Sequence, residues 1–548
     1  MGLWFKTKSL LMLMISIIST FMLMFLSSKT IFHYDVNSFL EMPFSITLIV
    51  DTQSLIFIST VSTVSSIIIM YSFYYLSEES PYSMKKFLLT LMVFIMSMFI
   101  LSVSANSFWL MVGWDGLGIS SFCLIIFYQN WKSLGSGMVT FLSNRLGDTL
   151  IIVSMTWIIL NQSTDAWMFP SFIFLLSLFM SIGAYSKSAQ LPYLFWLPQA
   201  MAAPTPVSAL VHSSTLVTAG IYLVCRFHPI SSSPVSIFFF SISCATVLVA
   251  GTSSLMEFDL KKVIALSTLC HISLMMMFSV LGEIHLSLFH LMMHAFFKSL
   301  LFMIAGYIIH CNHNSQDIRM ISIPKTSLSV SFPFLISISS MMGFPFLSGF
   351  YSKEALLMKS SLNLPSLLMM SMFLINSFFS CAYSTRLMTF LFSNHKKALY
   401  LSENTPFEPI FILGSLLSSF LGGLMILFIL PEEESVQPLM IKGLLLITCV
   451  SGIVVGASVS MSPSLMIINP LTELWKSDFL YKIFQKHFFL SSNIYMWVVD
   501  EKGISKIIYS NMMKKGKTLF NSMSEFFLKE PFSLPKMIHF LIIALFWM

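Results

Sequence analysis

Long apolar stretches, separated by short polar connections, follow one another along almost the whole chain. A helix needs about 20 apolar residues to cross a bilayer, and most of these stretches are close to that length. Because backbone groups in lipid must be satisfied within each segment, we expect helices and not strands. The stretches lie near 9–28, 54–76, 87–104, 107–128, 137–160, 169–185, 203–225, 236–253, 262–280, 284–310, 325–347, 366–392, 409–430, 438–459 and 534–548. The pattern predicts an all-α polytopic membrane protein with about fifteen transmembrane helices.

The C-terminal region follows a different pattern. Across 473–532, lysines are interleaved with Phe, Ile, Tyr and Met, which is typical of an amphipathic helix too polar to span a membrane. Pro531 and Pro535 separate this segment from the last apolar stretch, so a final anchoring helix is expected at 533–548. The amphipathic segment could lie on the lipid surface or run as a brace along neighbouring subunits.

Composition and charge agree with a membrane protein. Hydrophobic residues make up 56% of the 548 positions and charged residues only 10%, whereas a soluble domain has roughly a quarter of its residues charged. The net charge is +6, but the basic residues are scattered through short loops, as at Lys85 and Lys86. That distribution indicates membrane topology, with the N-terminus and the loops after even-numbered stretches on the inner side. We therefore expect no nucleic-acid partner.

Motifs for common cofactors are missing from the sequence. The seven cysteines form no CxxC pair, and there is neither a GxGxxG nor a GxxxxGK[ST] pattern. A zinc site, an iron–sulfur cluster, NAD or ATP held by this chain alone is therefore not expected. Any redox or hydrolytic energy would have to come from a partner.

A short pattern occurs twice, and it predicts two structural repeats. Both copies lie beside apolar sequence that Pro and Gly interrupt, at 191–210 and 341–350. Interrupted helices at matching positions in two halves of a chain are typical of the central site of a transporter. The copies are Gly183-x-Tyr185-Ser186-Lys187-x-Ala189-x-Leu191 and Gly349-x-Tyr351-Ser352-Lys353-x-Ala355-x-Leu357.

Three charged side chains fall inside or beside the apolar stretches. A charge at the bilayer centre costs at least about 2.5–3.5 kcal/mol, so each must be paired, neutralised or functional. Asp115 could be either a structural partner or a functional carboxylate. Lys187 and Lys353 could extend to the membrane surface, or face a water-filled cavity and carry protons. We expect Asp115 and Lys187 to lie within salt-bridge or single-water distance, because neither charge should be buried alone.

Histidines add further titratable groups. His290, His294 and Lys298 are spaced four apart, which places them on one face of a helix. The HxxxH spacing also fits a metal pair, but an ammonium one turn away opposes a cation and no acidic third ligand is evident. A proton relay fits better, because neutral imidazole both accepts and donates a proton. His212, about two turns after the prolines of 201–206, could be a core group or a relay group.

Arg145 and Asp148, three apart on another stretch, could neutralise each other or take part in function. Taken together, five or six titratable groups on several membrane segments, without a redox ligand set, are typical of a proton relay.

Several motifs resemble one family, the antiporter-like membrane subunits of mitochondrial respiratory complex I. The resemblance runs from about Asp51 to the C-terminus, and WDGLG at 114–118 and FDLKKVIALST at 258–268 are similar to arthropod-type versions. The motifs are NRLGD at 144–148, KSAQLP at 187–192, MAAPTPVSALVHSST at 201–215, HAFFKSLLF at 294–302, QDIR at 316–319 and PFLSGFYSK at 345–353.

The resemblance implies a proton-translocating subunit of the mitochondrial inner membrane with two inverted five-helix repeats, each containing a broken helix. It would bind other membrane-arm subunits and lipids, and 473–532 would be a lateral helix along them. NADH, FMN, iron–sulfur clusters and ubiquinone would be bound by other subunits and none by this chain. The implied divisions are N-terminal helices at 1–104, repeats at 105–255 and 256–400, further transmembrane helices at 401–472, the lateral helix at 473–532 and the anchor at 533–548.

The resemblance also implies roles for single residues. Asp115 would be the carboxylate paired with Lys187, and Asp148 would be the acidic residue of the NRxGD motif. A central bridge would be formed by His212, His294 and Lys298, with His290 beside it. Lys353 would be the terminal lysine that opens to the intermembrane space.

Two departures from the family pattern matter for these roles. Asp115 stands where many members have Glu, which shortens the side chain by one methylene. His271 stands where Gln is more usual, so it could add a relay group or merely pack. Two other functions stay open: a free-standing Na⁺/H⁺ antiporter subunit, and a structural subunit that only anchors the membrane arm.

Overall fold

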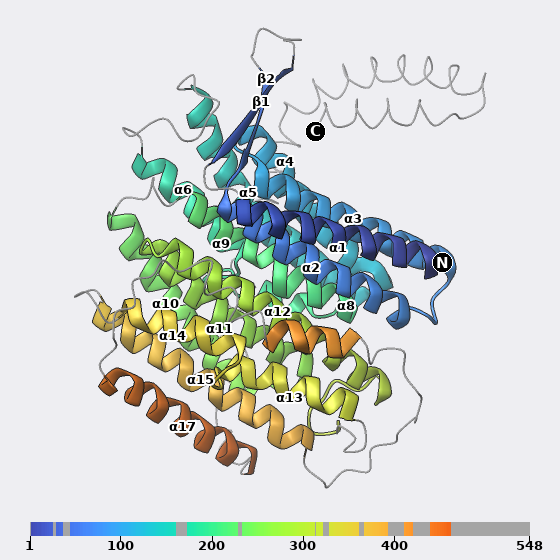
Figure 1. The fold of residues 1–548 in the computed structure, drawn as a ribbon, viewed down its shortest axis with the longest axis vertical. Helices are drawn as coiled ribbons and strands as arrows, with labels where there is room; N and C mark the ends of the chain where they lie inside the picture. The colour runs from blue at the N-terminus through green and yellow to red at the C-terminus, as the bar shows by residue number, and fades with distance from the viewer. Residues whose placement is uncertain are drawn as a thin grey trace, which may run out of the picture. The chain divides into compact units, whose positions relative to one another are not determined.

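Helices make up nearly all of the described chain in the computed structural model (Figure 1). The described residues belong to a unit that covers 1–477. The predicted lateral helix at 473–532 and anchor at 533–548 lie outside the described residues. The structure describes residues 2–25, 29–36, 44–160, 173–227, 233–312, 314–321, 328–360, 366–392, 410–419 and 439–461.

A helix lies in each predicted apolar stretch up to residue 459. Those of the first half are α1 (Gly2–Phe25), α2 (Thr52–Tyr75), α3 (Pro81–Val103), α4 (Ser107–Ile125), α5 (Trp131–Leu160), α6 (Ile173–Lys187), α7 (Trp196–Ala200), α8 (Thr205–Val207), a π-helical stretch (Ser208–Thr215) and α9 (Leu216–Phe227). The others are α10 (Ser233–Met256), α11 (Leu260–Val280), α12 (Ile284–Cys311), α13 (Leu328–Met342), α14 (Ser348–Ser360), α15 (Ser366–Phe392), Ile410–Ser419 and α17 (Leu439–Met461). Within the described residues, nine helices are long and apolar enough to cross a membrane. The predicted helical membrane protein is confirmed, and the count of about fifteen spans stays a prediction.

Polar side chains fix where several of these helices begin. Asp51 caps α2 by accepting from the backbone N–H of Ser54 at 3.0 Å, while the Ser54 hydroxyl accepts from the N–H of Asp51 at 2.9 Å. This reciprocal arrangement satisfies two donors that a helix start leaves without intrahelical partners. Ser80 caps α3, whose first residue is Pro81, and proline is favoured at that position because its missing N–H is not needed there.

The all-helical prediction is wrong at one place. Strands β1 (Thr30–Val36) and β2 (Phe44–Val50) form an antiparallel hairpin in which Thr30 pairs with Val50. The seven residues of β2 are rich in β-branched side chains and too short to cross a bilayer as a helix. The backbone groups of β2 instead form hydrogen bonds with β1. The apolar pattern of the neighbouring helical stretches gives no sign of this strand pairing.

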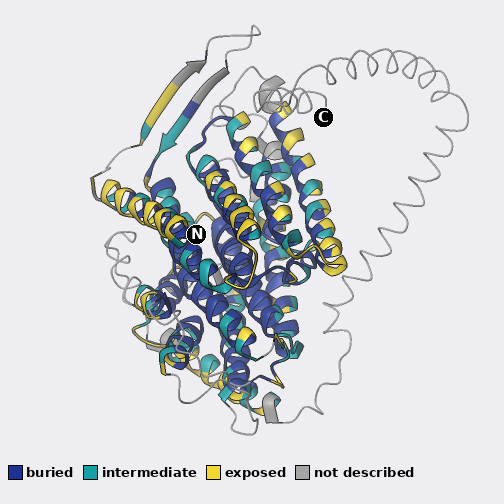
Figure 2. Cartoon of the chain, turned by 90° about the vertical axis from the view of Figure 1, so that its right-hand side faces the viewer, coloured by how far each residue is buried: buried dark blue, intermediate teal, exposed yellow. Residues whose placement is uncertain are grey.

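Burial separates the inner helices from the outer ones (Figure 2). In α11 and in residues 205–227, the apolar 18-residue window is entirely buried, whereas only 22% of the corresponding window in the N-terminal span is buried. The exposed side chains of α1 are largely apolar, among them Leu10, Ile17 and Phe21. An exposed apolar surface of this kind suits contact with lipid or with other membrane segments. The inner helices α11, α12 and 205–227 carry all of the histidines singled out in the sequence, together with Lys298.

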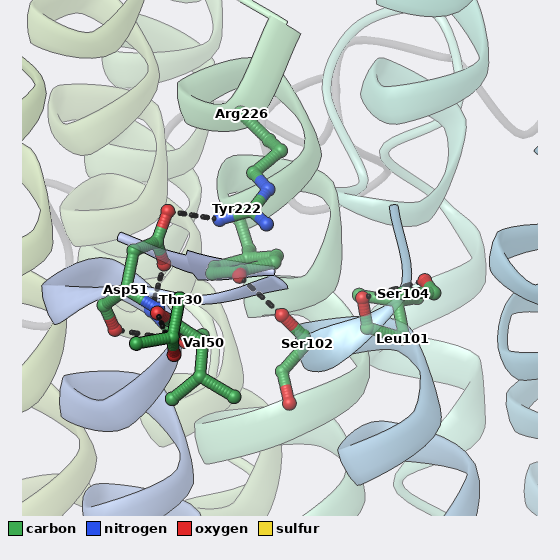
Figure 3. Close-up of polar contacts among 9 residues, drawn as sticks. Thr30, Val50, Asp51, Leu101, Ser102, Ser104, Tyr222 and Arg226 are labelled. Atoms are coloured by element: carbon green, nitrogen blue, oxygen red, sulfur yellow. Dashed lines mark hydrogen bonds and ion pairs between the residues drawn. The ribbon is translucent and has the colours of Figure 1, made fainter. Parts of the chain in front are cut away.

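A buried ion pair ties two of these elements together (Figure 3). Arg226 Nη1 near the end of α9 lies 2.7 Å from Asp51 Oδ2 at the start of α2, and both side chains are nearly buried. One turn before Arg226, the Tyr222 hydroxyl donates to the backbone carbonyl of Ser102 on α3 at 2.7 Å. These contacts fix the end of α9 against α2 and α3.

Helix interruptions lie beside both repeated lysines. Lys187 is the last residue of α6, and the chain then turns through Ala189 at φ 55° before α7 begins. Lys353 lies in α14, which is separated from α13 by a break that begins at Gly343 with φ 89°. Glycine is required at that φ, and a Cβ on Gly343 would lie only 3.0 Å from Lys353 Cδ. The predicted placement of both lysines beside interrupted helices is therefore confirmed.

Candidate functional site

Asp115, Arg145 and Asp148 form the first polar cluster of the bundle. Arg145 Nη1 on α5 lies 3.3 Å from Asp115 Oδ2 on α4 and 3.6 Å from Asp148 Oδ2 on its own helix. Asp148 is almost fully buried, whereas the side chains of Asp115 and Arg145 are each 35% exposed in this chain. Arg145 and Asp148 do form an ion pair, which was one of the two alternatives, and Asp115 joins them as a second carboxylate.

Lys187 reaches the same cluster through Trp114. The ammonium nitrogen donates to the Trp114 carbonyl oxygen at 2.5 Å and lies 3.8 Å from the centroid of its ring. The indole Nε1 of Trp114 donates to Asp148 Oδ1 at 2.7 Å. Asp115 and Lys187 form no salt bridge within the described part of the chain, and the single-water distance that was the other expectation stays a prediction. Asp115 is paired with Arg145 instead, and the Lys187 ammonium is bound by the residue before Asp115.

Close packing of α5 against α6 makes this arrangement possible. Gly147, inside the NRLGD motif, packs on Ser186, the residue before Lys187, so closely that a Cβ there would lie 2.7 Å from the Ser186 Cβ. Any larger residue would push α6 away from α5. The glycine therefore keeps Asp148 and Lys187 on facing helices at close range.

His212 lies in the π-helical stretch and is almost fully buried. The centroid of its ring lies 6.2 Å from that of Trp196, and the two rings meet edge-on. Neither ring nitrogen has a hydrogen-bond partner among the described residues. Burying a polar group without a partner costs about 1–3 kcal/mol, and π-helical turns occur often at functional sites. The alternative of a hydrogen-bonded core histidine is therefore not what the structure shows.

His290, His294 and Lys298 lie along α12 as the spacing predicted, but they have different partners. His290 bonds to the Ser352 hydroxyl at 2.9 Å through Nδ1 and to His271 Nδ1 at 3.2 Å through Nε2. His294 packs beside the His271 ring at 5.5 Å, and neither of its ring nitrogens has a hydrogen-bond partner among the described residues. The two histidines of the HxxxH pattern thus differ in their hydrogen bonding.

Lys298 and Lys353 are both held by uncharged groups. Lys298 Nζ donates to the Ser267 hydroxyl at 2.5 Å and contacts the Met341 sulfur at 3.0 Å. Lys353 Nζ donates to the Met341 carbonyl at 2.8 Å and to the Ser380 hydroxyl at 2.9 Å. Within the described residues, neither lysine forms an ion pair with a carboxylate. Met341 therefore contacts both ammonium groups.

Some residues of the site were not predicted from the sequence. Trp114 was noted only as part of the WDGLG motif. Its position directly before an intramembrane carboxylate is the sequence signal that could have marked it as a site residue. Ser267 was not singled out either, although it lies four residues before His271 on α11 and therefore on the same helical face. His271 also meets the Tyr383 hydroxyl at 3.4 Å, which makes it part of a polar network and not only a packing residue.

Metal binding was the alternative for the HxxxH pair. Among the residues that the structure describes, no group of three or more His, Cys, Asp or Glu side chains could hold a metal ion. His290 instead has Ser352 and His271 as its partners.

Comparisons with known proteins agree on one family. Residues 104–380 match the family described as NADH:quinone oxidoreductase/Mrp antiporter, transmembrane. The chain is 37% identical over 509 residues to NADH-ubiquinone oxidoreductase chain 5 of Anopheles quadrimaculatus, which covers 89% of this chain and 85% of the relative. It is 39% identical over 431 residues to the protein of the same name from Locusta migratoria, covering 76% and 74%.

Among solved structures, a chain of the Mrp complex from a Dietzia species has a similar fold, with a TM-score of 0.77 and 20% identity. The match covers 95% of this chain and 60% of that chain, and at this identity it shows the fold alone. The sequence relatives, together with the family match, show that the chain belongs to the NADH-ubiquinone oxidoreductase chain 5 family.

Proposed function

We propose that this chain is a proton-translocating membrane-arm subunit of respiratory complex I, in which buried Asp, Lys and His side chains pass the protons on. The observation that carries the proposal is the environment of its buried lysines. Lys187, Lys298 and Lys353 are buried among inner helices, and in the described part of the chain each ammonium is bound by uncharged groups. Such expensive charges inside a membrane protein usually mark an ion or proton pathway.

The proposed path begins at the carboxylates and ends at the terminal lysine. Asp148, with Asp115 beside it, exchanges a proton with Lys187, and His212 receives it next. His212 suits this step because its ring nitrogens are buried without a hydrogen-bond partner in the described chain. A neutral imidazole can accept a proton at one nitrogen and release the other proton.

The second part of the proposed path uses α12. His294 and His290 lead to Lys298 and then to Lys353, and the shared contact with Met341 keeps the two lysines near each other. Lys353 lies beside the break at Gly343, and irregular backbone at membrane depth is tolerated where it lines a water-filled cavity or is buried in protein. We assign the exit toward the intermembrane space to this break.

The energy for this movement is assigned to partner subunits. NADH oxidation and ubiquinone reduction, with FMN and iron–sulfur clusters, would take place outside this chain, in a complex of the mitochondrial inner membrane. The two antiporter-like repeats are proposed at 105–255 and 256–400, between the N-terminal helices at 1–104 and the transmembrane helices at 401–472. The chain acts as one component of an NADH:quinone oxidoreductase and has other membrane-arm subunits and lipids as partners.

The C-terminal segment is proposed to hold the subunit in its array. If 473–532 braces neighbouring subunits, truncation after Thr472 should release this chain from the complex more than it unfolds the helices before it. The amount of the truncated chain that co-purifies with the complex measures this, beside its amount in the membrane. Full retention in the complex would return the segment to the lipid-surface interpretation.

Replacement of Lys187 by Met tests the proposal most simply. Lys187→Met removes the proton carrier and roughly preserves side-chain volume, so the complex should assemble while proton translocation coupled to NADH oxidation falls by about half or more. The matched control is Lys86→Met on the exposed side of α3, which should leave coupling unchanged. A wild-type proton-to-electron ratio in Lys187→Met would rule out the relay.

A free-standing Na⁺/H⁺ antiporter is the second candidate, and the family match favours it because the description of that family includes the Mrp antiporter. The two functions differ in what drives the proton. A complex I subunit should move protons only while NADH is oxidised, whereas an antiporter should move them in response to a sodium gradient alone. Proton release from vesicles after a sodium pulse, without NADH, would favour the antiporter.

A further inference from the structure

Trp114 contacts both the cation and one carboxylate of the first polar cluster. Its side chain is completely buried on α4, one residue before Asp115. The indole N–H donates to Asp148, and the backbone carbonyl and the ring face bind the Lys187 ammonium. Trp114 therefore gives the Asp148 carboxylate a hydrogen-bond donor, and it gives the Lys187 ammonium both a carbonyl acceptor and the face of an aromatic ring.

These contacts occupy the Asp148 carboxylate and the Lys187 ammonium, which could otherwise form an ion pair with each other. Asp148 Oδ1 accepts from Trp114 at 2.7 Å, and Oδ2 lies 3.6 Å from Arg145 Nη1. Oδ1 thus has a hydrogen-bond donor and Oδ2 an ion-pair partner, and no ion pair joins Asp148 to Lys187 in the described structure. Tryptophan gives the strongest cation–π interaction of the aromatic side chains, and its indole has one N–H donor. Phenylalanine at this position would supply the ring face but no donor.

We infer that Trp114 is a positioning residue for proton transfer between Lys187 and Asp148. It holds the ammonium on its carbonyl and ring face and the carboxylate on its indole N–H, so the proton stays on Lys187 until one of the two side chains leaves Trp114. In the transfer, an N–H bond of the ammonium breaks and an O–H bond forms on Asp148, which leaves a neutral amine and a neutral acid. Trp114 itself neither gains nor loses a proton. The inference rests on the proposed function, because it requires Lys187 to carry protons.

The test is Trp114→Phe in the whole complex, alone and together with Asp148→Asn. Phenylalanine keeps a ring beside the ammonium and leaves the backbone carbonyl in place, but it removes the donor to Asp148. We expect fewer protons translocated per electron in Trp114→Phe, and no further fall when it is added to Asp148→Asn, where the side chain cannot take the proton. Trp109→Phe on the same helix is the matched control. Its half-buried ring packs edge-on against Phe108, and it should keep the wild-type ratio.

A vibrational measurement supports this test without a change at Trp114. Ultraviolet resonance Raman spectra of wild type minus Asp148→Ala should show the loss of one strongly hydrogen-bonded indole among the ten tryptophans of the chain. An unchanged indole N–H signal would overturn the inference. A wild-type proton-to-electron ratio in Trp114→Phe would also overturn it. So would a Trp114→Phe change that lowers this ratio equally whether residue 148 is Asp or Asn. If Lys187→Met also keeps the wild-type ratio, the proposed function fails; if Lys187→Met loses coupling and Trp114→Phe does not, only this inference fails.

Discussion

Two regions of the bundle hold buried positive charge in opposite ways. Where α2 meets α9, Arg226 lies 2.7 Å from the carboxylate of Asp51 (Figure 3). Beside α12, the ammonium groups of Lys298 and Lys353 contact hydroxyl, carbonyl and thioether groups, and neither has an ion-pair partner in the described chain. A buried cation thus has an anion in the first region and none in the second.

This difference separates a structural charge from a functional one. In a buried ion pair, each charge offsets the desolvation of the other, so the loss of one partner leaves an uncompensated charge. A lysine bound only by uncharged groups can lose its proton without breaking an ion pair. We therefore interpret Asp51 and Arg226 as a clamp between α2 and α9, and Lys298 and Lys353 as sites through which protons pass.

The largest effect on stability is expected at the clamp. Arg226→Met should destabilise the chain by about 3–5 kcal/mol, because it leaves the Asp51 carboxylate buried without its partner. The amount of assembled complex in the membrane and its thermal inactivation temperature measure this. The double variant Asp51→Asn with Arg226→Met should recover part of the loss, since no unpaired charge remains. Equal losses in the single and double variants would contradict the clamp.

The opposite result is expected at Lys353. Burying a charge is costly unless the charge is paired, and Lys353 has no carboxylate partner in the described chain, so Lys353→Met should assemble as well as wild type. Its coupled proton translocation should fall, because the ammonium bound by Met341 and Ser380 is lost. If Lys353→Met were strongly destabilised but still coupled proton translocation to NADH oxidation, Lys353 would have a structural role, as Arg226 does, and would not carry protons.

The network around His271 should show an intermediate effect. His271→Leu leaves His290 Nε2 and the Tyr383 hydroxyl without their recorded partner, which should cost about 1–3 kcal/mol of stability. His271→Gln can still hydrogen-bond, so it should recover most of that stability. Thermal inactivation of the two variants compares them directly. Equal loss in both would show that ring packing, and not hydrogen bonding, is the role of His271.

Among the residues that pair or hydrogen-bond with another side chain, the smallest loss of stability is expected at Asp115. Its side chain is 35% exposed, and Arg145 keeps Asp148 as a second partner. Asp115→Asn should therefore cost only about 0.2–1 kcal/mol, as for other partly exposed ion pairs. A loss as large as that of Arg226→Met would mean that Asp115 and Arg145 also form a structural clamp.

The sequence predicted most of the helices and the interruptions beside Lys187 and Lys353, but few of the contacts among the candidate residues. The lengths of the apolar stretches predicted where the helices lie. The prolines of 201–206 and Gly343 predicted where helices are interrupted, because these residues affect the backbone locally. The hairpin of β1 and β2 was not predicted, because it forms only when two short segments pair and neither segment shows this by itself. The partner of Lys187 was also missed, because whether an ammonium meets Asp115 or Trp114 depends on how α4 and α6 pack together. No local pattern in either helix contains that information.

The most direct test of the account is the proton-to-electron ratio of the complex carrying Lys298→Met, reconstituted in sealed vesicles. Lys298 is buried on α12 with a serine hydroxyl and a methionine sulfur as its recorded partners, so a purely structural chain would gain nothing from its charge. The account predicts an assembled, NADH-oxidising complex that translocates fewer protons per electron than wild type and than the Lys86→Met control. A Lys298→Met complex with the wild-type ratio would contradict the claim that buried lysines without carboxylate partners carry protons through this chain.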